Sequence, residues 1–519
     1  MTTVEKIKAK ILDLAIRGKL VPQDPNDEPA SELLKRIRAE KEELVKAKKI
    51  KKEKNPSEIV IGSDGRPYEK FADGKTVCIE DEVPFALQPG WAWARLKNLS
   101  ESIQYGYNAP AKVAGRIRMV RITDIQNNGI LWGQVPYCDI EEVDIPKYLL
   151  QAEDLLFART GGTVGKSYLV SDVPEAAVYA GYLIRTRCAE SLLPQYAKRF
   201  MESACYWTQL RKDVIATAQP NCNGQKLGEM LIPLPPLAEQ KRIVSKIEEQ
   251  FAEVEKISAA VNEITRTAER INKKVLDLAM RGQLVPQDPN DEPAEKLLKR
   301  IAEARQHNAN VKSRKSKCDE SVIFYGADRS AYETRNGKTV CIDDEIPFET
   351  PVSWAWTRLG DIFQHNTGKA LNRNSSGGEF KEYITTSNVY WDEFKLDTLK
   401  SMRFTEDELD KCTIKEGDLL VCEGGDIGRA AIWNLKREVC IQNHLHRLRP
   451  YMEICRSYFC FALRHYKYTN RLQGKGIGLQ GFSSGMLHIL LIPFPPLAEQ
   501  KRIVAKIEEV RKLTRSLTT

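Results

Sequence analysis

Several features that define other classes of protein are missing from this chain of 519 residues. No stretch approaches the run of about 18 apolar residues that a membrane helix needs, so we expect no membrane span. Residues 1–20 form an amphipathic pattern without the apolar core of a secretion signal. The 12 cysteines include no Cys-x-x-Cys pair. We therefore expect reduced thiols in a cytoplasmic protein rather than a zinc site or disulfides.

Catalytic motifs are equally scarce. All six histidines lie in the second half, so any chemistry shared by both halves does not depend on histidine. The segment Thr160–Ser167, TGGTVGKS, resembles a phosphate-binding loop but has Thr where the motif requires Gly. We find no methyltransferase tetrapeptide, no helicase-type phosphate loop and no nuclease carboxylate–lysine constellation. The sequence predicts a chain without catalytic residues and without a metal site.

What the chain does contain is a tandem repeat. LDLAIRGKLVPQDPNDEPA at 12–30 returns at 276–294 with 17 of 19 positions identical. PPLAEQKRIVSKIEE at 235–249 returns at 495–509 with one change. Between these anchors the two copies share little sequence. We call the repeated segments the frame, and we expect a duplicated helical frame that carries two divergent inserts.

The frame predicts long helices. From Ile243 to Leu278 the apolar residues recur every 3.5 positions on average, which is the period of a left-handed coiled coil. A helix over 238–281 would extend about 65 Å at 1.5 Å per residue. Its apolar stripe needs partners, and the two ends of the chain offer matching stripes. The residues expected at partner or coiled-coil contacts are Leu237, Ile243, Ile247, Phe251, Val254, Val261, Ile264, Ile271, Leu497, Ile503 and Ile507.

The net charge of +8 permits nucleic-acid binding without establishing it. Residues 35–54 carry ten Lys and Arg against four Glu, and residues 296–317 carry eight against one. Each basic tail is either a solvated helix end or an arm that contacts phosphates or a partner protein.

The inserts predict mixed α/β domains, since short β-branched runs such as 117–122 alternate with Gly and Asn turns. Both inserts keep a Gly-Gly-x-x-Gly-basic segment, which is either a loop that presents a basic side chain or a structural turn. Arg, Lys, Asn and His side chains are suited to phosphates and base edges. The DNA-binding candidates are Asn108, Lys112, Arg116, Arg118, Arg121, Lys166, Arg185 and Arg187 in the first insert, and Lys369, Asn372, Arg373, Arg429, Asn443, His444, His446, Arg447, Arg449 and Lys475 in the second. His444 and His446 are expected to share one face of a strand, as a surface or DNA-facing pair rather than a metal pair.

Two divergent domains in a duplicated helical frame, each closed by PLAEQKRIV, resemble the specificity (S) subunit of type I restriction-modification enzymes. The resemblance covers essentially the whole chain. It implies an α+β fold of two mixed α/β target recognition domains joined by long antiparallel coiled-coil helices in a pseudo-twofold tandem repeat. The implied segments are an N-terminal helical region (1–86), recognition domain 1 (87–231), a central helical region (232–349), recognition domain 2 (350–491) and a C-terminal helix (492–519).

The same resemblance implies a non-catalytic subunit. Each recognition domain would read one half of an asymmetric bipartite site in double-stranded DNA, and the helices would set the spacer. Two methyltransferase (M) subunits and restriction (R) subunits would be the partners, so that adenine methylation and phage defence lie in the complex. S-adenosylmethionine, ATP and magnesium would then be bound by those partners, with no cofactor in this chain. The alternative is a coiled-coil scaffold without DNA specificity.

Overall fold

The computed structural model describes residues 2–53, 55–126, 129–214, 221–311, 321–371, 377–472 and 482–518. The chain separates into two compact units, Met1–Ala260 and Val261–Thr519. The boundary falls at the middle of the repeat, as the duplicated frame predicts.

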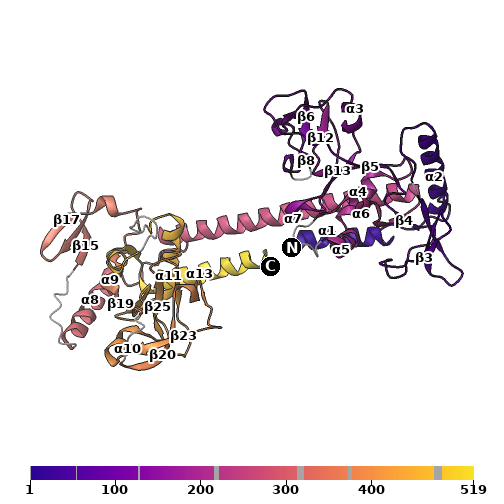
Figure 1. Ribbon diagram of the computed structural model, residues 1–519. Coiled ribbons are helices and arrows are strands. Elements are labelled where there is room, and N and C mark those ends of the chain that lie inside the picture. The colour runs from indigo at the N-terminus through magenta and orange to yellow at the C-terminus, as the bar shows by residue number, and fades with distance from the viewer. Residues whose placement is uncertain are drawn as a thin grey trace. The chain divides into compact units, whose positions relative to one another are not determined.

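The frame of the first unit begins with helices α1 (Thr3–Ile16) and α2 (Ala30–Lys46), followed by a small antiparallel sheet. The sheet consists of β1 (Ser57–Ile61), β2 (Pro67–Phe71) and β3 (Thr76–Cys78). Strand β4 (Ala92–Arg95) then pairs with β14 (Leu231–Leu234), so that the first insert leaves and re-enters the frame at one place. The long helix α7 (Leu237–Met280) follows directly (Figure 1).

The first insert is built on a four-stranded sheet in the order β11-β10-β13-β5 and a three-stranded sheet in the order β12-β6-β9. Its elements are β5 (Ser100–Tyr105), β6 (Ile117–Val120), β7 (Ile125–Gln126), β8 (Gly129–Ile130), β9 (Tyr137–Cys138), α3 (Ile145–Tyr148), β10 (Leu155–Ala158), β11 (Ser167–Leu169), β12 (Ala177–Tyr179), β13 (Leu183–Cys188), α4 (Pro194–Glu202), α5 (Ala204–Val214) and α6 (Gly224–Gly228). The mixed α/β expectation is confirmed.

The second unit repeats this plan. Its frame contains α8 (Ala294–Val311), the sheet β15 (Ser321–Tyr325), β16 (Ala331–Arg335) and β17 (Lys338–Cys341), the pair β18 (Ala355–Arg358) and β29 (Leu491–Phe494), and the C-terminal helix α13 (Leu497–Ser516). The insert contains α9 (Leu359–Ile362), β19 (Phe363–Thr367), β20 (Glu379–Ile384), β21 (Val389–Tyr390), β22 (Glu393–Phe394), β23 (Lys400–Phe404), α10 (Glu406–Cys412), β24 (Thr413–Ile414), β25 (Leu419–Cys422), β26 (Ala430–Ile432), β27 (Val439–Ile441), β28 (Leu445–Pro450), α11 (Arg456–Tyr468) and α12 (Ser484–His488).

The two inserts share their sheets although they share little sequence. The order β19-β28-β25-β26 matches β5-β13-β10-β11, and the parallel pair β20–β27 matches β6–β12. The central pairing also keeps its register, because Arg185 lies opposite Gln104 and Arg447 lies opposite Asn366. The two inserts are therefore copies of one fold.

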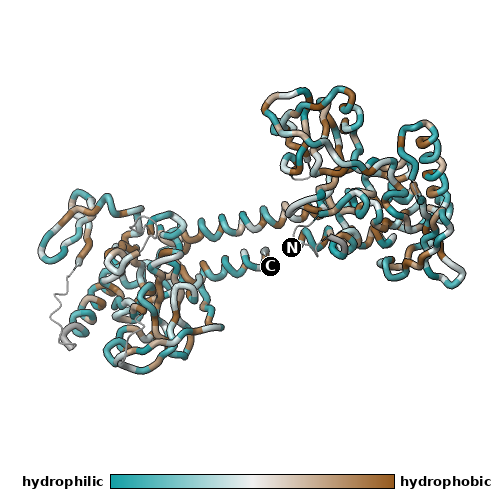
Figure 2. Tube along the Cα trace, in the orientation of Figure 1, coloured by the Kyte–Doolittle hydropathy of each residue, from teal (hydrophilic) through white to brown (hydrophobic). Residues whose placement is uncertain are grey.

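Helix α7 supplies one half of its length to each unit, and each half has a partner from a chain end. In the first unit, α1 runs antiparallel to α7, with the Lys8 ammonium on Glu255 at 2.5 Å. In the second unit, α13 runs antiparallel to the other half, and Asn272 donates to Thr514 at 3.0 Å. The antiparallel helices of the expected fold are thus present in each unit, and hydrophilic and hydrophobic residues alternate along α7 (Figure 2).

The residues predicted at partner or coiled-coil contacts fall into two groups, buried and exposed. Four of them are fully buried where α7 or α13 packs on its unit: Ile243, Ile247, Ile503 and Ile507. Four others are partly buried and pack against the same two cores: Leu237, Phe251, Val254 and Leu497. The remaining three, Val261, Ile264 and Ile271, are 51, 44 and 39% exposed. The apolar stripe of α7 is thus covered at both ends of the helix and uncovered along its middle.

Candidate nucleic-acid interface

The repeated PLAEQKR segment holds the frame together. Glu239, at the start of α7, is buried, and its carboxylate accepts hydrogen bonds from Trp91 Nε1 at 2.9 Å and from Gln23 Nε2 at 2.6 Å. Burial raises the pKa of Glu239, and the two donors oppose that rise. The second copy repeats the contact with Glu499, Trp354 and Gln287.

Two neighbours of Glu239 add further contacts, and we call the contacts of Glu239, Gln240 and Arg242 together the clamp. Gln240 accepts a hydrogen bond from Leu193 N at 2.8 Å, which joins α7 to the insert. Arg242 pairs with Asp27 of the VPQDPND loop at 2.6 Å. The counterparts are Gln500 with Cys455 N, and Arg502 with Asp291. The duplicated signature is therefore a structural device that fixes each insert to its helices.

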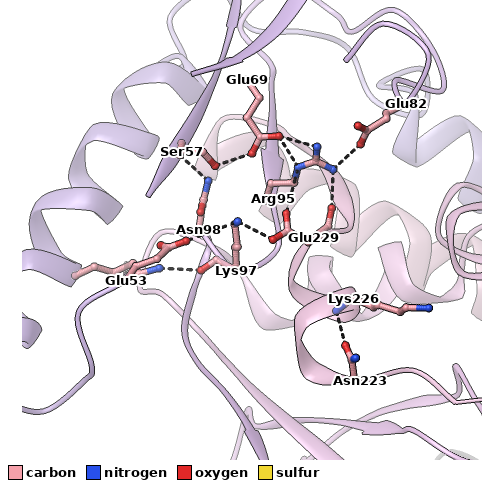
Figure 3. A network of polar contacts seen from close by, with 11 residues as sticks. Glu53, Ser57, Glu69, Glu82, Arg95, Lys97, Asn98, Asn223, Lys226 and Glu229 are labelled. Carbon is pink, nitrogen blue, oxygen red and sulfur yellow. Dashed lines mark hydrogen bonds and ion pairs between the residues drawn. The ribbon is translucent and has the colours of Figure 1, made fainter. Parts of the chain in front are cut away.

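A second buried network lies between the small sheet and the insert (Figure 3). The Arg95 guanidinium bonds Glu69 at 2.7 Å and Glu82 at 2.9 Å, and Ser57 donates to Glu69 at 2.6 Å. Burial opposes the charge of Arg95, but these carboxylates outweigh it and raise its pKa. Nearby, Lys97 pairs with Glu229 at 2.7 Å. In the second unit Arg358 bonds Glu333 and Glu345 in the same way.

Beside this network a groove of about 1370 Å³ separates α2 from β5. Lysines of the first basic tail line it, and two of these, Lys51 and Lys52, are exposed without an ion pair among the described residues. The last six residues of the other tail, 312–317, lie outside the described residues. Both interpretations of the tails, solvated helix end or contact arm, remain predictions.

One arginine of each pair on β13 and β28 is buried, and the other is partly exposed. Arg185 is 3% exposed, and its guanidinium donates to Leu149 O at 2.8 Å and to Gln104 Oε1 at 2.9 Å. Burial lowers the pKa of Arg185. Arg187 binds the buried carboxylate of Asp154 at 2.9 Å.

The second insert repeats the arrangement. Arg447 is 2% exposed and donates to Thr413 O at 2.6 Å, while Arg449 binds the buried Asp418 at 2.6 Å. An alternating Arg-x-Arg pattern does not show whether that face of the strand is buried. The sequence therefore predicted all four arginines as DNA contacts. Their burial and internal hydrogen bonds give Arg185 and Arg447 a role inside the domain, and we leave these two out of the interface.

Four loops of the first insert meet at one edge of its main sheet. We call this the first loop edge: residues 105–108, 159–166, 181–182 and 221–226. Tyr105 Oη accepts a hydrogen bond from Gly224 N at 2.7 Å, and Arg159 N donates to Tyr182 O at 3.2 Å. Of the predicted residues, Asn108 and Lys166 lie here. Both are exposed, and Lys166 has no ion pair among the described residues.

Four other candidates of the first insert belong to ion pairs. Lys112 pairs with Asp139, Arg116 with Glu142 at 3.7 Å, Arg118 with Glu175 at 3.0 Å and Arg121 with Asp124 at 2.7 Å. The Lys112 and Arg116 pairs are exposed and contribute only about 0–1 kcal/mol each, so a phosphate can replace the carboxylate at little cost. Asp124 is buried, so its pair with Arg121 is part of the domain structure.

The second insert has the corresponding loop edge, around residues 368–371, 423–429 and 442–444. Asn443 N donates to Lys369 O at 3.0 Å, and Glu423 N donates to His444 O at 2.9 Å. Lys369 is held by Glu408 at 2.7 Å, and Arg429 donates to Thr386 O at 2.6 Å. Three further candidates, Asn372, Arg373 and Lys475, lie outside the described residues.

The expectation that His444 and His446 form one surface pair is wrong. His444 precedes β28 and is exposed, whereas His446 is fully buried within it. Its Nε2 lies 3.1 Å from Phe482 O, and its ring meets the His365 ring at 4.8 Å. Within the described part of the chain, no group of three His, Cys, Asp or Glu residues is placed to hold a metal ion. No helix among the described residues is long and apolar enough to cross a membrane.

Sequence reasoning missed some residues of the first loop edge. Arg159 and Tyr182 are joined by a backbone hydrogen bond between distant loops, and Asn223 caps α6 within its own loop. For Arg159, its place two residues before a Gly-Gly loop was the available hint.

Comparison with known proteins gives the class to which this fold and frame belong. Residues 93–266 and 351–519 match the family described as type I restriction modification DNA specificity domain. The two matched ranges together span more than half of the chain, and they coincide with the two inserts and the helices that follow them. The chain belongs to this family.

The relatives are specificity subunits. The chain is 27% identical to the type I restriction enzyme EcoAI specificity subunit of Escherichia coli, over 98% of this chain and 89% of that protein. It is 25% identical to the EcoEI specificity subunit of the same organism, with the same coverage. The HsdS subunit from Thermoanaerobacter tengcongensis shares the fold, with a TM-score of 0.50 and 19% identity over 84% of this chain and 93% of that one. The resemblance to a type I specificity subunit is therefore confirmed.

Proposed function

We propose that this chain is the DNA-recognition subunit of a type I restriction-modification complex and that each insert reads one half of a split, asymmetric site. One observation carries the proposal: a single frame, duplicated almost letter for letter, holds two inserts with the same sheets and different loop edges. A shared frame with different reading surfaces suits a site whose two halves differ.

Helix α7 would act as the spacer between the half-sites. Its 44 residues correspond to about 66 Å at 1.5 Å per residue. Half-sites about one helical turn of DNA apart are separated by roughly 34 Å, which a rigid helix of this length is able to span.

The frame would also dock two methyltransferase subunits. The support is the uncovered apolar stripe in the middle of α7, where Ile257, Val261 and Ile264 are 56, 51 and 44% exposed. Exposed apolar patches of this kind mark protein–protein contacts. Restriction subunits would join the same complex in the cytoplasm. S-adenosylmethionine, ATP and magnesium would be bound by these partners, and we assign none of them to residues of this chain.

Exchange of one insert tests the proposal. We would replace residues 87–231 by the corresponding insert of a relative and map methylated adenines in host DNA. We expect one half of the site to change while the other half and the spacer stay the same. A site that changes in both halves, or does not change, would contradict the modular assignment. Replacing 350–491 is the matched control and should change the opposite half.

A further inference from the structure

Arg159 stands out on the first loop edge. It directly follows β10, and its guanidinium carbon lies 4.6 Å from the centre of the Tyr105 ring. Its side chain makes no ion pair or hydrogen bond to the described residues, and its Nε atom is buried without a partner. A half-buried guanidinium with nothing to bond inside the chain is suited to a ligand outside it.

The position of Arg159 is set by its surroundings. Tyr105 belongs to β5, where it pairs with Ile184, and its hydroxyl is held by Gly224 N at 2.7 Å. The backbone of Arg159 is tied on both sides, to Tyr182 O at 3.2 Å and to Cys222 N at 3.0 Å. Because the ring and the backbone are both fixed, the guanidinium plane is oriented before any ligand arrives, which reduces the entropy lost on binding.

The second insert does not have this pair. The register of β5 and β19 places Thr367 where the first insert has Tyr105. The position two residues before the Gly-Gly segment is Cys422, which is buried. By contrast, a basic residue after the loop is present in both inserts, as Lys166 and Arg429.

Arg159 is found in one insert and the basic residue after the loop in both, which suggests two different kinds of DNA contact. Contacts to phosphates carry no sequence information and suit positions that both inserts share. Contacts to base edges must differ between inserts that read different half-sites. An arginine fork donates two hydrogen bonds to N7 and O6 of guanine, the commonest specific contact in the major groove.

We propose that Arg159, stacked on Tyr105, is a specificity-determining residue that reads a guanine in the half-site of the first insert. The inference rests on the proposed function, and it names the base and the residue that recognises it.

The test uses the complete complex of this chain with its methyltransferase partners, after the methylated site has been mapped. Binding is measured to the cognate duplex and to duplexes that change one base pair of the first half-site at a time. For Arg159→Ala we expect discrimination at one G·C pair to fall by about 10- to 100-fold, with the second half-site unaffected. Lys166→Ala is the comparison, since a phosphate contact should weaken binding to every duplex alike and lower the salt slope by about one.

Arg159→Gln keeps a planar amide and guards against a loss of folding in the alanine variant. Glutamine pairs with N6 and N7 of adenine, so we expect it to shift the preference at that position from G·C towards A·T. Unchanged discrimination at every position would overturn the inference, as would a uniform loss with a salt slope lowered by about one. A wild-type complex that does not discriminate between any duplexes would overturn the proposed function itself, so the two failures are distinguishable.

Discussion

The carboxylate of Glu239 accepts a hydrogen bond from the indole nitrogen of Trp91 at 2.9 Å, which joins residues 148 positions apart. Both residues are buried, and the same contact recurs between Glu499 and Trp354. The most recognisable segment of the sequence, PLAEQKR, thus serves to hold each insert on its helices. Its repetition reflects a shared architecture, and the candidate DNA contacts lie elsewhere.

We expect Trp91→Phe to destabilise the first unit by about 1–3 kcal/mol, because the buried carboxylate loses a hydrogen-bond donor. Hydrogen exchange resolved by unit, combined with urea unfolding, measures the effect. Ser245→Ala is the control, since this exposed position is where the two copies of the signature differ. Trp354→Phe should affect the second unit in the same way. Equal stability of Trp91→Phe and wild type would show that the Trp91–Glu239 hydrogen bond does not stabilise the first unit.

Arg185 and Lys166 should respond differently to substitution. Arg185 is buried and bonded to carbonyl oxygens, so Arg185→Met should lower the free energy of unfolding by about 1–3 kcal/mol and leave the salt dependence of DNA binding unchanged. Lys166→Ala should lower the salt slope by about one at constant stability. The measurements are denaturant unfolding and binding at several salt concentrations. A lower salt slope for Arg185→Met would restore it to the interface.

Lengthening α7 tests the spacer. Seven residues added after Ala260 preserve the heptad register and lengthen the helix by about 10 Å. If α7 sets the gap, the gap between the methylated half-sites should widen by up to about three base pairs, and neither half-site should change. A seven-residue insertion in the exposed turn at 63–66 is the control, and it should leave the gap as it is. An unchanged gap in the α7 variant would exclude the helix as the spacer.

Acid should weaken the second unit more than the first. Burial, reinforced by neighbouring His446 and His488, lowers the pKa of His365 to about 3. The folded state therefore keeps His365 neutral, whereas the unfolded chain takes up a proton below about pH 6.5. This contribution to stability is present above pH 6.5 and is lost as the pH falls from 6.5 towards 3, by about 2 kcal/mol at pH 5.

The first unit supplies the control for this prediction, because the first half of the chain contains no histidine. The register of β5 and β19 places Ile103 where the second insert has His365. His365→Ile should therefore reduce the acid sensitivity of the second unit, as measured by unit-resolved hydrogen exchange between pH 7 and pH 5. Equal acid sensitivity of the two units in the wild type would contradict the assignment.

The frame was predictable from the sequence. The expected central helix, 238–281, agrees with α7 at Leu237–Met280 to within one residue at each end. The helix ends there because Gly282, at φ +67°, supplies the left-handed conformation that terminates a helix, and Gly18 does the same in the first copy. Periodicity and helix-stop residues are local signals, which one sequence carries in full.

The burial of the candidate interface residues was predictable only in outline. Lys166 and Asn108 are exposed on the first loop edge, as expected for DNA contacts. His446, Arg185 and Arg447 were misjudged as surface groups, because a strand residue belongs to the core or the surface according to what packs on its sheet. Arg159 is a single arginine in the sequence, and it becomes distinctive only when β5 brings Tyr105 beneath it.

The sequence by itself determined that the chain is two copies of one frame around two divergent inserts, because repeats and helical periods are written along the chain. Only the tertiary structure decided which charged side chains are structural and which are available to a ligand. The physical reason is that burial and hydrogen-bond satisfaction depend on contacts between residues far apart in sequence, such as Arg187 with Asp154 and Glu239 with Trp91.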